Sequence, residues 1–169
     1  MSKARTCVVL ITLTLASLQF QSSVFAFDNQ LSRETLRGLQ GVRVMVAPQK
    51  WAIEQKGLSA EQLQQDTELK LRLAGINVPS AESPEMPGKP LLYVNAKILK
   101  YGSLDRYIFN IKLELNQGVS LIRMPSVKAS ATTWSVAVTG TSHKLSTVRE
   151  QLQELVDIFI NAYLSVNPK

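Results

Sequence analysis

Apolar and polar residues alternate along several segments of the chain, as expected for strands with one buried face. The apolar side of the three clearest segments comprises Leu92, Val94, Ala96 and Ile98, then Tyr107, Phe109, Ile111, Leu113 and Leu115, and finally Thr132, Trp134, Val136 and Val138. A shorter alternating segment, QGVRVMVA at residues 40–47, ends before Pro48. We also expect a short strand at residues 76–78, and a bulge at Gly118 before VSLIRM continues the pairing.

Two other segments are predicted to be helices. The first begins at Ser59, where SAEQ has the spacing of a capping box, and runs to Ala74 before Gly75. Its leucines are Leu63, Leu69, Leu71 and Leu73. In the second, Thr147 and Glu150 have capping-box spacing. Its apolar residues fall at steps of three and four, which makes it strongly amphipathic: Val148, Leu152, Leu155, Val156, Phe159, Ile160 and Tyr163.

The order of these elements predicts an α+β fold, a mostly antiparallel sheet of about five strands with two helices packed on one face. Residues 79–90 hold four of the seven prolines, so this segment is expected to be an exposed loop. It could instead link two domains, but the halves on either side are too small to fold alone. We therefore expect one domain over residues 27–169.

Residues 1–26 have the layout of a secretory signal peptide. Lys3 and Arg5 precede an apolar run over residues 8–20, and Val24 and Ala26 place small residues before a cleavage site. A retained membrane anchor is the alternative, but a spanning helix needs about 20 apolar residues. We expect cleavage after Ala26 and no transmembrane segment in the processed chain.

Cysteine content and charge narrow the location and the partners. The single cysteine, Cys7, lies within the predicted signal peptide, so an exported chain would contain no disulfide, which favours the bacterial periplasm. Loss of Lys3 and Arg5 would lower the formal net charge from +6 to +4. No run of five like charges marks a nucleic-acid-binding arm. The expected location is periplasmic or secreted, with no nucleic-acid partner.

A resemblance to known proteins rests on three segments, LRLAGINV, TTWSVAVTG and ELVDIFINAYLSVNP, and on the order of the elements. The segments resemble those of small exported bacterial proteins of unassigned activity. The element order is similar to that of the amino-terminal domain of TolB proteins and of related envelope lipoproteins. The resemblance implies the same fold and favours binding over catalysis, but it carries no site residue.

Candidate catalytic chemistry centres on His143, the only histidine. Ser142 precedes it, yet GTSHK lacks the second glycine of a nucleophile elbow, and sequence neighbours do not establish a catalytic arrangement. With one histidine and no cysteine after residue 26, a zinc site is improbable, and no calcium-binding loop pattern occurs. We predict no metal, no cofactor and no catalytic residue.

The polar side of the predicted sheet is the candidate binding surface. It presents Tyr93, Asn95, Lys97, Asn110, Lys112, Glu114, Thr133 and Ser135. From this set we take Tyr93, Asn95, Lys97, Asn110 and Lys112 as binding residues, together with Trp51 in the loop after the first strand. An open antiparallel face can also simply be solvated. A sheet edge or the proline-rich loop are the other possible docking surfaces.

These expectations favour a non-enzymatic, exported binding or accessory protein of the bacterial cell envelope. Its partner would be another envelope protein, or a cell-wall or lipid component. One alternative is a small hydrolase that uses His143. Another is a carrier that holds an apolar ligand between the sheet and the helices.

Overall fold

The computed structural model describes residues 23–47, 58–80, 82–101 and 105–168. Along the chain the elements are β1 (Ser23–Phe27), α1 (Gln30–Glu34), β2 (Arg43–Val46), α2 (Ala60–Leu73), β3 (Leu91–Lys100), β4 (Tyr107–Leu121), β5 (Met124–Ser142) and α3 (Ser146–Val166). The five strands form one sheet in the order β1-β5-β4-β3-β2. Only β2 and β3 run parallel, and the other neighbours are antiparallel.

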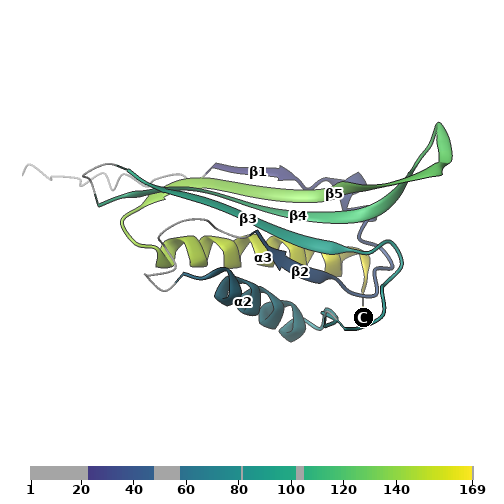
Figure 1. The fold of residues 1–169 in the computed structure, drawn as a ribbon, viewed down its shortest axis with the longest axis horizontal. Helices are drawn as coiled ribbons and strands as arrows, with labels where there is room; N and C mark the ends of the chain where they lie inside the picture. The colour runs from purple at the N-terminus through teal and green to yellow at the C-terminus, as the bar shows by residue number, and fades with distance from the viewer. Residues whose placement is uncertain (1–22, 48–57, 81, 102–104, 169) are drawn as a thin grey trace, which may run out of the picture.

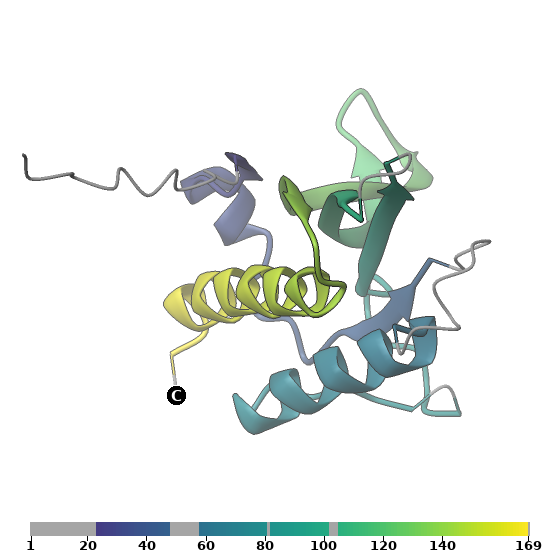
Figure 2. The same cartoon turned by 90° about the vertical axis from the view of Figure 1, so that its left-hand side faces the viewer.

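Both long helices lie on the same side of the sheet, as Figure 1 shows, and Figure 2 shows α2 beside α3 beneath the strands. The helices α2 and α3 contact each other, while α2 also contacts β2 and α3 contacts β4 and β5. The predicted α+β fold is therefore confirmed: a mostly antiparallel five-stranded sheet with two helices on one face.

The core lies between this helical layer and the sheet. The apolar side chains predicted for β3, β4 and β5 are buried, and the stripe of α3 packs against them. Thr132, predicted on the same side as Trp134, is the exception: it is exposed and bonds to Asn116, because the β4–β5 register shifts there. Trp134 and Phe159 are fully buried, with their rings edge to face and their centroids 5.2 Å apart. Such aromatic side chains bury large apolar areas and contribute strongly to core stability.

The first predicted helix is confirmed at both ends, although only the Ser59 half of its predicted capping box is formed. The Ser59 hydroxyl accepts from the Gln62 backbone N–H at 3.1 Å, and Gly75 follows the helix with φ +82°. Its buried positions are Leu63, Thr67 and Leu71. Leu69 and Leu73 do not join the core, because they lie on the outer side of α2 and are 56% and 79% exposed.

Two predictions about short segments are wrong: the strand at residues 76–78 and the capping box of the last helix. Residues 76–78 form no strand, although the Asn77 carbonyl accepts from the Val42 N–H at 3.0 Å. Gly41 has φ +154°, and a Cβ atom there would clash with that same carbonyl, so the close approach requires glycine. The last helix has no capping box, since α3 begins after Leu145 without a side-chain cap and Thr147 accepts from the Ser142 hydroxyl.

The β4–β5 pairing is irregular at a different place from the one predicted. Gly118 stays in register, and its N–H donates to the Gly88 carbonyl at 2.6 Å. The register shifts instead between Leu115 and Asn116, which pairs with Thr132, and again between Ser120 and Leu121. Thr133 therefore leaves the predicted polar band, and its hydroxyl accepts from the Gln117 amide at 2.7 Å.

Two amino-terminal elements were not expected. The strand β1 pairs with β5 from Ser23 to Phe27, so the predicted signal cleavage after Ala26 falls inside this strand. The helix α1 follows Asn29, whose side chain forms a capping box with Ser32. Cleavage after Ala26 stays a prediction. It would leave Phe27 as the remaining residue of β1.

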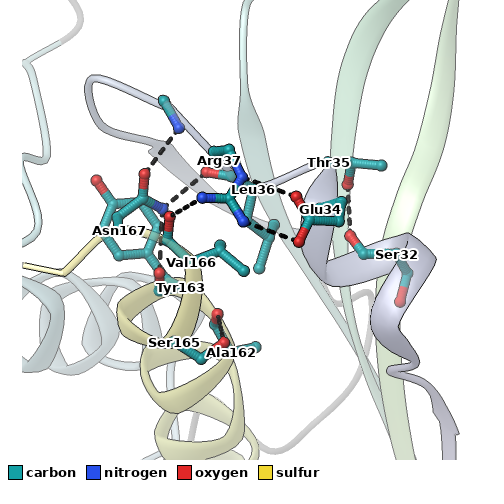
Figure 3. Close-up of polar contacts among 11 residues, drawn as sticks. Ser32, Glu34, Thr35, Leu36, Arg37, Ala162, Tyr163, Ser165, Val166 and Asn167 are labelled. Atoms are coloured by element: carbon teal, nitrogen blue, oxygen red, sulfur yellow. Dashed lines mark hydrogen bonds and ion pairs between the residues drawn. The ribbon is translucent and has the colours of Figure 1, made fainter.

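The segment after α1 is fastened to the end of α3, as Figure 3 shows. The Asn167 side chain accepts from the Gly38 N–H at 2.7 Å and donates to the Leu36 carbonyl at 2.9 Å. The Tyr163 hydroxyl donates to the Leu39 carbonyl at 2.8 Å, and burial raises the pKa of this phenol. These bonds hold the chain leading into β2 against the helical layer.

Candidate functional site

The five predicted binding residues of the sheet lie on its helix-free face. In the β3–β4 register Asn95 faces Lys112, Lys97 faces Asn110, and Tyr93 faces Glu114. Residues directly opposite in an antiparallel pair share one face, so these side chains form neighbouring rows. We call the face that they share the open face. Trp51 lies outside the described residues.

Hydrogen bonds and one ion pair join the rows of the open face. Lys112 Nζ lies 2.7 Å from Glu114 Oε1, and the Thr132 hydroxyl donates to Asn116 Oδ1 at 2.8 Å. Asn110 Nδ2 donates to the Thr139 hydroxyl at 2.8 Å. The polar groups of β4 and β5 are thus preorganised, which lowers the ordering cost of binding.

Exposure differs along the open face. Lys97 and Asn110 are exposed, whereas Tyr93, Asn95 and Lys112 are half-buried. Lys97 takes part in none of the ion pairs found among the described residues. The face therefore offers an ammonium group, amide donors and acceptors, and one aromatic ring to a partner.

A pocket of about 240 Å³ opens where the open face meets the proline-rich loop. Its lining comprises Arg43, Met45, Glu85, Met86, Lys89, Pro90 and Leu91. The Arg43 guanidinium donates to the Ser83 carbonyl at 2.7 Å and so ties β2 to the loop. Glu85 and Lys89 pair at 2.7 Å, and hydrogen bonding from Lys89 lowers the pKa of the Glu85 carboxyl.

Sequence reasoning missed this pocket. Met45 looked like a strand residue between two buried valines, and Met86 looked like part of an exposed loop. The two come together because β2 pairs with β3 in parallel, with Met45 facing Tyr93, and because the loop folds back beside them. The one available signal was the proline-rich loop itself, which we had named as a possible docking surface.

Ser142 and His143 do not form a catalytic dyad. The Ser142 hydroxyl donates to Thr147 at 2.9 Å and accepts from the Lys144 N–H at 3.0 Å. His143 Nε2 lies 3.1 Å from the Arg106 guanidinium, and its Nδ1 lies 2.8 Å from the Asp105 carbonyl. Because arginine can only donate, Nε2 accepts and Nδ1 carries the proton. The ring nitrogen that would serve as a base is therefore occupied.

One buried carboxylate was also missed. Asp28 accepts from Arg33 at 2.7 and 2.6 Å, and from the indole N–H of Trp134 at 2.9 Å. Hydrogen bonding from Arg33 lowers the pKa of the Asp28 carboxyl, while burial opposes this shift. The arrangement satisfies a fully buried tryptophan and anchors the start of the domain, so its role is structural.

Within the described ranges no group of three or more histidine, cysteine, aspartate or glutamate side chains is placed to hold a metal ion. None of the helices in that part of the chain is both long enough and apolar enough to cross a membrane.

Comparison with known proteins gives a limited result. No protein-family model matches the chain, and no curated protein matches it. Among solved structures, a PelC dodecamer from Paraburkholderia phytofirmans is similar, with a TM-score of 0.46 and 16% sequence identity. The match covers 86% of this chain and 96% of that one. A likeness of this degree carries no argument about function. The resemblance to TolB-type domains stays a prediction.

Proposed function

We propose that this chain is a non-enzymatic accessory protein of the bacterial cell envelope that binds another envelope protein through its open face. The observation that carries this proposal is the preorganised polar surface of that face, on which Tyr93, Asn95, Lys97, Asn110 and Lys112 lie together. No helix of the described chain packs on this side of the sheet.

The pocket beside Met45 and Met86 supports the same function. Methionine side chains adapt to the shape of a partner because they are flexible and polarizable. Arg43 and the Glu85–Lys89 pair place charges around these methionines. A partner side chain of apolar character would fit there, while its neighbours would reach the polar rows.

The envelope location rests on the amino-terminal sequence pattern. Processing by a signal peptidase would produce a chain that begins at Phe27, two residues after Phe25 and directly before Asp28. Mass spectrometry of the protein recovered from the periplasmic fraction would check this start. Recovery of the uncleaved chain from the cytoplasm would contradict the proposal.

Partner capture from native envelope extract tests the binding surface. Lys97→Glu reverses a charge on the open face that forms no ion pair among the described residues, so capture of the partner should fall by about tenfold or more. Lys144→Glu is the matched control, because Lys144 is also exposed but lies in the turn before α3. A charge reversal at Lys112 would be harder to interpret, since it would also break the ion pair with Glu114.

The two variants must behave differently for the proposal to hold. Both should give the same circular dichroism spectrum as the parent protein, because each changes an exposed side chain. Capture that survives Lys97→Glu, or that falls equally with Lys144→Glu, would remove the open face as the binding surface.

A further inference from the structure

The outer part of the β4–β5 hairpin stands apart from the rest of the sheet. The pairing of β3 with β4 ends where Leu91 faces Asn116, while β4 and β5 stay paired as far as Leu121 and Met124. Figure 1 shows this two-stranded extension projecting past both long helices and bending away from their side of the sheet. We call residues 119–128 the hairpin tip.

The hairpin tip exposes apolar side chains to an unusual degree. Ile122 is 98% exposed, Met124 52% and Val127 39%. Ile122 and Arg123 form the turn itself, a position where glycine, asparagine and aspartate are the usual residues. A branched apolar side chain gains nothing from standing in water at the end of a projecting turn. Its presence there points to contact with another apolar phase.

The charged side chains of the hairpin tip are all positive. Arg123 and Lys128 are both exposed, and the sequence has no acidic residue between Glu114 and Glu150. Glu114, at the inner end of the extension, is already paired with Lys112. The tip therefore combines protruding apolar side chains with two cationic ones that no nearby residue along the strands neutralises.

We propose that the hairpin tip contacts the surface of an anionic membrane. Ile122 and Met124 enter the boundary between headgroups and acyl chains, and the long side chains of Arg123 and Lys128 reach the lipid phosphates. A protein partner fits the tip less well, because a stable protein interface buries roughly 800 Å² per partner and a narrow two-residue turn offers much less. The inference goes beyond the proposed function, since it assigns a second surface with a different ligand.

Vesicle co-sedimentation tests the proposal. The protein is prepared from cells that express the full chain, and mass spectrometry confirms that all variants have the same amino terminus. The probes are vesicles of phosphatidylcholine and phosphatidylglycerol in equal parts, and vesicles of phosphatidylcholine alone. The parent protein should bind the anionic vesicles and release them at high salt. Ile122→Asp should lower this binding by about tenfold or more, as should Arg123→Ser combined with Lys128→Ser.

Leu73→Asp is the matched control, because Leu73 is 79% exposed on α2 and lies away from the tip. It should bind vesicles like the parent protein, and so should Lys97→Glu, the variant expected to lose partner capture. The tip variants should in turn retain capture, so the two proposals fail separately. The lipid proposal is overturned by a parent protein that ignores anionic vesicles, by equal binding to neutral ones, or by equal loss in Leu73→Asp. A cross-link from residue 122 to a protein, without vesicle binding, would assign the tip to a protein partner.

Discussion

The two faces of the sheet are built from the same strands but have different chemistry. On the helical side, Leu113, Trp134 and Phe159 are completely buried, and close packing leaves little freedom for substitution. On the open face the side chains are polar and half-buried or exposed, and hydrogen bonds from Asn110 and Thr132 join β4 to β5. Stability therefore resides mainly on the covered face, which leaves the open face available for recognition.

The largest expected effect is on the covered face. Phe159→Ala removes a fully buried ring that packs against Trp134, and it should lower the free energy of unfolding by about 3–5 kcal/mol. Urea denaturation of the parent and variant proteins measures the difference. A loss no larger than that caused by a substitution on the open face would contradict the contrast between the two faces.

The next largest effect is expected at Asp28, which accepts a hydrogen bond from the buried Trp134. Asp28→Ala leaves the buried indole N–H of Trp134 without its acceptor and should cost about 1–3 kcal/mol of stability near neutral pH. The folded state lowers the pKa of Asp28, so its contribution is complete above the pKa of the unfolded chain and disappears as the pH falls through the folded pKa.

The pH dependence of stability provides a control for the Asp28→Ala variant. The stability difference between the parent and Asp28→Ala should be constant above about pH 5 and should shrink in more acidic solution. Denaturation midpoints measured across this range check the sign. A difference that grows on acidification would mean that Asp28 is not held as a carboxylate by Arg33.

A smaller effect is expected at the helix that flanks the covered face. Ser59→Ala removes the acceptor for the Gln62 N–H at the start of α2 and should cost about 1 kcal/mol. Ser59→Asp keeps an acceptor and serves as the matched control. Equal thermal melting of the parent and Ser59→Ala would show that the cap contributes nothing to stability.

The smallest effect on stability is expected on the open face. Asn95→Ala should change the free energy of unfolding by less than about 0.5 kcal/mol, because Asn95 alternates with the buried Val94 and Ala96 and so lies on the helix-free face. The same urea titration measures it, with Phe159→Ala as the reference. A cost of several kcal/mol would show that the open face is part of what holds the fold together.

The hydrophobic periodicity of the sequence predicted the sheet and the helical layer well. The residues that it assigned wrongly have physical explanations. The alternation through Phe109 and the stripe through Phe159 suffice to define a covered face, because burial imposes the period of each element. Thr133 was assigned to the wrong side because a register shift depends on pairing rather than on composition. Thr147 fits a capping pattern, but its hydroxyl accepts from Ser142 instead.

The candidate site was predictable only where it follows strand periodicity. The five open-face residues come from two adjacent strands, so alternation alone placed them together. The pocket at Met45 and Met86 depends on a parallel pairing and on the path of a loop, neither of which leaves a local signal. The buried position of Asp28 could not be predicted for a similar reason, since its partner Trp134 lies 106 residues away in the sequence.

The most direct test of the central claim is photo-cross-linking in living cells. A photoreactive amino acid replaces either Lys97 on the open face or Glu154 on the exposed side of α3, and adducts are identified by mass spectrometry. The account predicts that position 97 yields a specific adduct with an envelope protein and that position 154 yields none. Adducts from position 154 alone, or the same adducts from both positions, would contradict it.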